Sequence, residues 1–183
     1  GGGFVNRRMK SHYVILSPRA CLYIGFLMDA MDTRFNWMQV AKRELGIAQF
    51  PPGASNPRIM EYHATTSIDA QNDKTAWCSS FVNWCFAQAG IPGTGSARAR
   101  SWLDWGQAID TPQPGCIAVL YREDPDSWKG HVGFFLRVDN DHVYLLSGNQ
   151  LEKVCVHYYP RTTVLGYRLP DAQYLPCADE NAG

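Results

Sequence analysis

The chain has 183 residues, of which 45% are hydrophobic, 13% aromatic and 19% charged, a composition typical of one globular domain rather than a disordered or repetitive protein. Its 17 Lys and Arg residues balance 17 Asp and Glu residues, so the formal net charge is zero. No net positive charge attracts the chain to polyanions, which disfavours nucleic acid or an anionic membrane surface as its main partner.

The cysteine pattern does not indicate a metal centre or a disulfide framework. Six cysteines are spread along the chain without a C-x-x-C pair or a cysteine and histidine cluster at the spacing of a structural zinc site. We therefore expect no metal and no organic cofactor. A single disulfide between Cys155 and Cys177 is one alternative, which the sequence alone cannot assign.

Residues 1–32 are expected to be an N-terminal arm or the remnant of a tag. They begin with three glycines, and basic residues precede two short apolar stretches at 13–16 and 21–28. Both stretches are far shorter than the ~18–20 residues of a membrane span, and they match no convincing signal peptide. We expect no membrane span, and the role of this arm stays open.

Helix signals come first in the domain that we place at residues 33–172. Apolar residues recur at helical spacing, with N-cap residue types before some segments and glycines just beyond others. Helices are expected at 35–45, 56–62, 78–89 and 96–105.

Strand signals fill the second half, and residues 173–183 are expected to be a C-terminal tail. Short segments rich in β-branched and aromatic residues alternate with turn-forming residues. Strands are expected at 116–121, 131–138, 142–147, 153–159 and 163–169. Because the connections are too short for crossover helices, the pattern predicts an α+β fold with N-terminal helices packed on an antiparallel β-sheet.

Cys78 is the leading candidate for a nucleophile. It opens the helix expected at 78–89, where unpaired backbone N–H groups and the helix dipole favour thiolate over thiol. The same N–H groups, including that of Ser79, would bind the oxyanion of a tetrahedral intermediate. A small, buried and inert cysteine is the alternative that stays open.

A cysteine nucleophile needs a base, and His131 fits best among the five histidines. It begins the strand expected at 131–138, so its ring should lie at a sheet edge. The base in turn needs a polar group at its other ring nitrogen. An antiparallel neighbour ending in LLSGNQ would bring Asn149 beside His131, with Gln150 and Ser147 as the alternatives.

Taken together, these motifs resemble a known family. Their order is similar to that of the NlpC-type branch of papain-like cysteine peptidases, which are related to the CHAP amidases. The motifs are, in chain order, TAWCSSFVNWC, GTGSARARSWLDWG, PGCIAVL, GHVGFF and LLSGNQ. The resemblance covers roughly residues 37–170. It implies a circularly permuted papain-like core that hydrolyses amide bonds in peptidoglycan peptides, with Cys78 as nucleophile, His131 as base and Asn149 as third member.

The chain departs from the family pattern at two points. Many relatives have Asp before the nucleophile and Gly soon after it, whereas this chain has Trp77, Ser79 and Ser80. Many also use His as the third residue, and none occurs near Asn149. Of the three catalytic residues that the resemblance implies, Asn149 therefore has the least support from the family pattern.

Candidate substrate-binding residues follow the nucleophile helix. Muropeptide stems carry carboxylates, which Arg side chains bind in bidentate fashion, so Arg98 and Arg100 are candidates. Trp77 and Trp102 are candidates for the walls of a cleft, although most tryptophans serve in packing.

The leading hypothesis is a monomeric cysteine amidase or endopeptidase that cuts the stem peptides of peptidoglycan. A compact catalytic domain of this kind fits a phage lysin or a toxin delivered between bacteria, for instance by type VI secretion, made in the cytoplasm and acting in the periplasm or at the cell wall. In the toxin case the producer would need an immunity protein. Two alternatives stay open: a papain-like protease or isopeptidase acting on a protein substrate, and a catalytically inert binding module.

Overall fold

The computed structural model describes residues 35–176. The arm expected at 1–32 and most of the tail expected at 173–183 therefore lie outside the described residues, as does Cys177. Within the described range, no helix combines the length and the apolar character needed to cross a bilayer.

Three α-helices precede the sheet, close to where the sequence predicts them. They are α2 (Asn36–Arg43), α3 (Pro57–His63) and α4 (Cys78–Gln88). The side-chain oxygen of Asn56 accepts a hydrogen bond of 3.0 Å from the backbone N–H of Arg58, as expected for an N-cap residue. α4 is buried along almost its whole length, because it passes between the other helices and the sheet.

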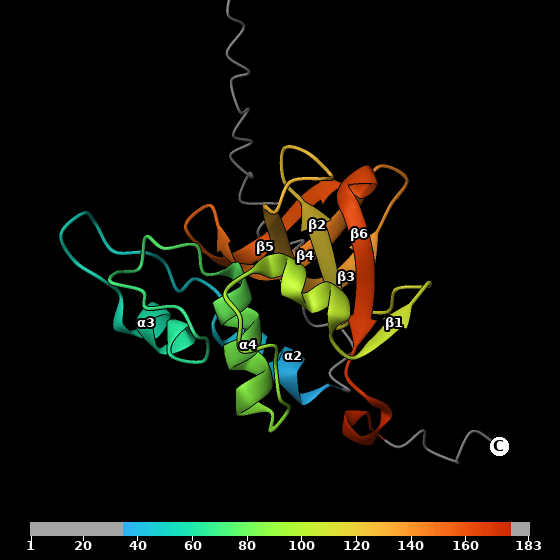
Figure 1. Ribbon diagram of the computed structural model, residues 1–183, viewed down its shortest axis with the longest axis horizontal. Coiled ribbons are helices and arrows are strands. Elements are labelled where there is room, and N and C mark those ends of the chain that lie inside the picture. The colour runs from blue at the N-terminus through green and yellow to red at the C-terminus, as the bar shows by residue number, and fades with distance from the viewer. Residues whose placement is uncertain (1–34, 177–183) are drawn as a thin grey trace, which may run out of the picture. The chain divides into compact units, whose positions relative to one another are not determined.

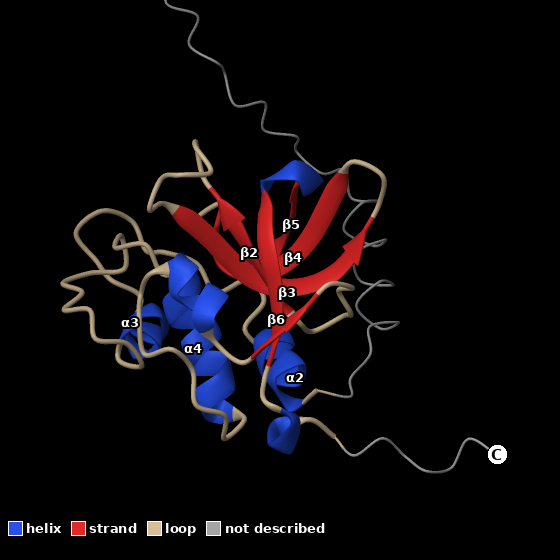
Figure 2. Cartoon of the chain, turned by 45° about the vertical axis from the view of Figure 1, so that its right-hand side comes forward, coloured by secondary structure: helices blue, strands red, loops and turns tan. Residues whose placement is uncertain are grey.

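The strands form one six-stranded antiparallel sheet in the order β1-β6-β2-β3-β4-β5. Their bounds are β1 (Gln107–Ile109), β2 (Ile117–Tyr121), β3 (Gly130–Val138), β4 (His142–Gln150), β5 (Lys153–Pro160) and β6 (Val164–Leu169). Figures 1 and 2 show α2, α3 and α4 gathered on one side of this sheet, with α4 packed against β3 and β4. The predicted α+β class with an antiparallel sheet is confirmed.

The segment expected to be a helix at 96–105 is different. Only a 3₁₀ helix, η1 (Ala99–Asp104), forms there, and two further 3₁₀ turns follow at η2 (Arg161–Thr163) and η3 (Ala172–Tyr174). The backbone carbonyl of Ser96 accepts from the hydroxyl of Ser79 at 2.6 Å, so it is committed to α4 and does not start a helical ladder. The short strand β1 was not predicted, and its three residues are mostly exposed.

The start of α4 is held against β4 by close packing at a glycine. A Cβ atom added at Gly148 would lie 2.5 Å from the indole of Trp77 and 2.8 Å from the Cβ of Phe81. No side chain fits in that space without a shift of the helix or the strand. The absence of a side chain at Gly148 therefore sets how closely the beginning of α4 approaches the sheet.

Candidate active site

Cys78 is the first residue of α4, and only 7% of its surface is exposed. Burial raises the pKa of its thiol above the usual value, although backbone N–H groups of Val132, Ser79 and Cys78 itself favour the thiolate. The charge of Arg122 acts in the same direction as those N–H groups. Burial is the largest influence, so Cys78 is a thiol at neutral pH, whereas the helix-terminus argument alone predicted a thiolate.

His131 is the second residue of β3 and is 5% exposed. Burial lowers the pKa of its imidazole to about 4, against a smaller opposing effect of its hydrogen bond with Gln150. The nearby charges of Arg122 and His157 lower it further. The ring is therefore neutral at pH 7 and able to accept a proton.

The two residues are brought together where the start of α4 meets the start of β3, an interior strand of the sheet. Val132, the neighbour of His131 in β3, directs its backbone N–H to the sulfur of Cys78. Tyr159 of β5 lies on the other side, with its ring centroid 5.1 Å from that of His131 and its hydroxyl within the electrostatic influence of Cys78. Tyr159 was not singled out from the sequence, because its position in a half-buried strand gives no local sign of this contact.

The residue that contacts the histidine is Gln150. Its Oε1 lies 3.2 Å from Nε2 of His131 and accepts a second hydrogen bond of 3.0 Å from the hydroxyl of Tyr159. The sequence favoured Asn149 for this place, but the Oδ1 of Asn149 accepts from the amide of Gln49 instead. The prediction of Asn149 beside His131 is therefore corrected to Gln150, the named alternative.

A β-bulge explains the change. Ser147 pairs with Cys155 and Gln150 pairs with Lys153, so two residues of β4 stand opposite one residue of β5. Asn149 is one of the two and has a left-handed backbone with φ of 56°. The extra residue breaks the simple alternation of the strand and turns Gln150 toward the histidine.

The contacts of Gln150 also define the tautomer of His131. Its amide nitrogen donates to backbone carbonyls, including that of Cys155, so its oxygen is the atom that faces the ring. An amide oxygen can only accept, so Nε2 of His131 must carry the hydrogen. In the neutral ring the basic lone pair is then on Nδ1, which makes no hydrogen bond among residues 35–176.

The remaining residues expected near the nucleophile form part of the core. Ser79 is fully buried, and its hydroxyl accepts from the indole N–H of Trp102 at 2.9 Å. Trp77 and Trp102 are both 0% exposed. Neither tryptophan can line an open cleft in this structure, so their expected contact with substrate is corrected to a packing role.

The two predicted substrate-binding arginines differ in their surroundings. Arg98 is exposed, and its backbone N–H donates to the hydroxyl of Ser96. The guanidinium of Arg100 donates to the backbone carbonyls of Lys129 at 3.2 Å and Pro125 at 2.8 Å. Arg100 therefore fixes the β2–β3 loop and is not free to bind a substrate carboxylate.

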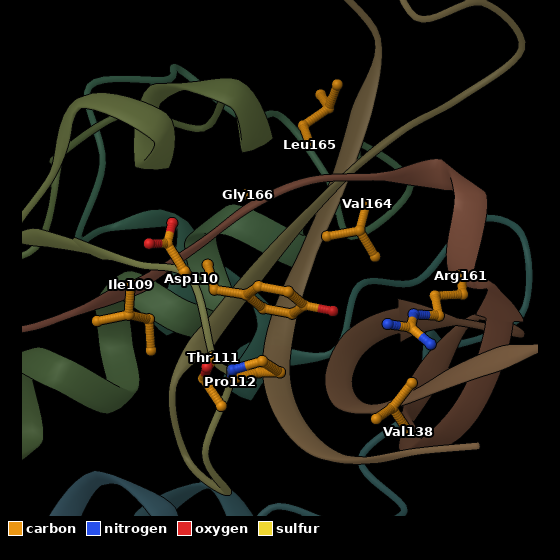
Figure 3. Close-up of a pocket in the computed structure, with 10 residues that line it drawn as sticks. Ile109, Asp110, Thr111, Pro112, Val138, Arg161, Val164, Leu165 and Gly166 are labelled. Carbon is orange, nitrogen blue, oxygen red and sulfur yellow. The ribbon is translucent and has the colours of Figure 1, made fainter. Parts of the chain in front are cut away.

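A hollow of about 610 Å³ lies at another part of the sheet, between the turn after β1 and the residues of β6. Figure 3 shows Asp110 and Arg161 at its opposite ends, and its lining includes none of Cys78, His131 and Gln150. Elsewhere between residues 35 and 176, no group of three His, Cys, Asp or Glu side chains is arranged to hold a metal ion.

Comparison with known families points to the same site. Residues 70–149 match the model of the CHAP domain, and no curated protein matches the chain significantly. CHAP domains are typically cysteine- and histidine-dependent amidohydrolases that often act on peptidoglycan. A match to this family is consistent with a papain-like fold. The matched segment contains both Cys78 and His131. The resemblance seen in the sequence is therefore confirmed: residues 70–149 match the CHAP domain, a family of amidase and peptidase domains related to the NlpC-type cysteine peptidases.

Proposed function

We propose that this chain is a cysteine amidase or endopeptidase that cleaves amide bonds in the stem peptides of peptidoglycan, with Cys78 as nucleophile, His131 as general base and Gln150 as the residue that orients the base. The observation that carries the proposal is the hydrogen bond between Gln150 Oε1 and His131 Nε2, beside a cysteine at a helix start. A thiol, an imidazole and an orienting amide are the parts that a cysteine hydrolase requires.

The resting pair is neutral, so the reaction begins with a proton transfer. Nδ1 of His131 takes the thiol proton of Cys78 as the sulfur attacks the carbonyl carbon of the substrate. The tetrahedral intermediate collapses to a thioester when the C–N bond breaks, and the imidazolium gives its proton to the leaving amine. Water, deprotonated by the same histidine, then hydrolyses the thioester and restores the thiol.

Gln150 contributes orientation and a dipole. Its oxygen faces Nε2–H of His131, so it stabilises the imidazolium that forms during both proton transfers. Tyr159 donates to the same oxygen and restricts the position of the amide. For the oxyanion we propose the backbone N–H groups at the start of α4, that of Ser79 first, because they already approach the sulfur of Cys78.

We also propose the finer features that the family resemblance implies. The catalytic domain would span residues 33–172, since α2 and α3 contribute buried side chains to the same core as α4. The core would be the circularly permuted papain-like form of the NlpC-type relatives, in keeping with a cysteine at a helix start followed by a histidine at a strand start. A monomer acting in the periplasm or at the cell wall, as a phage lysin or an antibacterial toxin with an immunity partner, fits the substrate.

The direct test is digestion of purified peptidoglycan sacculi, with the released muropeptides identified by mass spectrometry. Wild-type protein should release peptide fragments, and Cys78→Ala and His131→Ala should each reduce release by at least about a thousandfold, as expected for members of a catalytic unit. Sacculi left intact by a folded wild-type protein would refute the substrate. Cleavage that persists in Cys78→Ala would refute the nucleophile.

The third position is tested by comparing Gln150→Ala with Asn149→Gly, which keeps the left-handed backbone at that position. We expect Gln150→Ala to lower kcat by about 10- to 100-fold, because a hydrogen bond to a charged ring is lost. Asn149→Gly should have a clearly smaller effect. The reverse ranking would return the orienting role to Asn149.

A further inference from the structure

The exposed side chain of Arg122 stands out beside the candidate active site because, among residues 35–176, no side-chain hydrogen bond or ion pair holds it. Arg122 follows directly after β2, and its backbone N–H donates to the carbonyl of Lys129 at 3.3 Å, which extends the β2–β3 ladder by one step. Its side chain is exposed. The charged group of the same loop that feels its charge is the carboxylate of Glu123, the next residue.

The register places Arg122 on the same face of the sheet as His131. Leu120 of β2 pairs directly with His131 of β3, so their side chains share a face. Side chains alternate along a strand, and Arg122 is two residues beyond Leu120. Arg122 is therefore the diagonal neighbour of His131, within reach of a long side chain.

The electrostatic contacts agree with this register. The positive charge of Arg122 is felt by the thiol of Cys78, by the ring of His131 and by the hydroxyl of Tyr159. One guanidinium thus acts on three groups of the candidate site.

The surrounding loop keeps this guanidinium free. The adjacent carboxylate of Glu123 is paired with Lys129, whose Nζ lies 2.8 and 2.9 Å from its two oxygens. Arg100 holds the same loop by its backbone carbonyls. The carboxylate next to Arg122 in the chain therefore has Lys129 as its hydrogen-bonded partner, although the charge of Arg122 also helps to lower the pKa of Glu123. The loop that carries Arg122 is fixed by Arg100, which packs beside Gly130.

We propose that Arg122 binds a carboxylate of the substrate next to the scissile amide, and so selects peptides that carry a free carboxylate at that position. Guanidinium groups bind carboxylates with two parallel hydrogen bonds, which adds direction as well as charge. The inference rests on the proposed peptide-cleaving function. It replaces Arg98 and Arg100 as the expected carboxylate-binding residues.

The experiment uses one set of soluble muropeptides in two forms, unmodified and with the carboxyl groups converted to carboxamides by carbodiimide and ammonia. The full chain is assayed on both forms as wild type, Arg122→Gln, Arg122→Lys and Arg43→Gln. Arg43 is an exposed arginine in the last turn of α2, so its variant makes the same change in net charge at another place.

For wild type we expect kcat/KM to be about 10- to 100-fold higher on the unmodified than on the amidated peptides. Arg122→Gln should reduce this ratio to near one, Arg122→Lys should keep a part of it, and Arg43→Gln should leave it as in wild type. Using the ratio removes any general effect of the lost charge on Cys78 and His131, since that effect acts on both substrates.

The outcomes separate the two proposals. If wild type cleaves both forms equally well, or if Arg122→Gln keeps the full ratio, the carboxylate-binding role is overturned and the peptidoglycan hydrolase stands. If folded wild type cleaves neither form, the proposed function fails, and the role of Arg122 falls with it.

Discussion

The buried histidine makes the stability of the fold depend on pH in a calculable way. The pKa of His131 is about 4 in the folded chain, against about 6.5 for an imidazole in an unfolded one. Between these values the unfolded state binds a proton that the folded state does not. The stabilisation is therefore fully present above about pH 6.5 and is lost as the pH falls toward 4.

The size of this loss follows from the two pKa values. At about pH 5 the linkage relation gives a loss of about 2 kcal/mol relative to pH 8, and it approaches about 3 kcal/mol near pH 4. Burial also lowers the pKa of His63 and His157, so their contributions add to the total. The contribution of His131 alone must be taken as a difference between two proteins.

The assay is urea unfolding of the full chain and of His131→Gln, which cannot titrate, at about pH 8 and about pH 5. The free energy of unfolding of wild type should fall more steeply than that of the variant, and the extra fall should be about 2 kcal/mol. The other histidines are the same in both proteins and cancel in this comparison. An equal fall in both proteins would show that His131 takes up its proton over the same pH range in the folded and unfolded states, and the lowering of its pKa by burial would be refuted.

Further predictions concern the site and its supports. As the pH falls, kcat/KM should decrease with a midpoint near the pKa of His131, about 4. Iodoacetamide should alkylate Cys78 slowly at about pH 7, because burial raises the pKa of its thiol. Rapid alkylation at that pH would contradict the buried, neutral thiol. Gly148→Ala should lower the free energy of unfolding by about 1–3 kcal/mol in urea titrations, since the new Cβ would meet the indole ring of Trp77 at 2.5 Å. Gly166→Ala is the control: its Cβ would lie 3.3 Å from the end of a flexible leucine side chain, so the free energy of unfolding should change by less than about 1 kcal/mol. Asp73→Asn should cost about 1–3 kcal/mol at pH 7 by the same measurement, because this buried carboxylate accepts two backbone N–H bonds of 2.8 and 2.9 Å; an unchanged unfolding midpoint would refute that role.

Features specified by local sequence were predictable. α4 combines apolar residues at helical spacing with a glycine just after its end, and the strands carry β-branched and aromatic residues between turn-forming segments. Their order was enough to bring the first turn of α4 and the start of β3 into one site. Cys78 and His131 could therefore be paired without coordinates, although their catalytic roles remain predictions until activity is measured.

Features that depend on pairing between distant segments were not predictable. Gln150, and not Asn149, contacts His131 because β4 has one extra residue opposite β5. The residue types give no sign of this, since an Asn or a Gln could stand beside the histidine. Arg100 and Arg122 are equally basic in sequence, but only the loop contacts in three dimensions show which guanidinium is already bonded. Trp102 was expected near substrate, but its indole reaches the hydroxyl of Ser79 inside the core.

Burial accounts for both the neutrality of the candidate catalytic pair and the importance of nearby charge. Removing Cys78 and His131 from water disfavours the charged form of each, so the thiolate and imidazolium form together only when something stabilises them. Gln150 offers a dipole to the imidazolium, and backbone N–H groups approach the sulfur. A substrate carboxylate held by Arg122 would bring negative charge toward the forming imidazolium while reducing the effect of the guanidinium on it. Substrate binding would then raise the basicity of His131 at the moment when it must take the proton of Cys78, which links selection of the substrate to activation of the nucleophile.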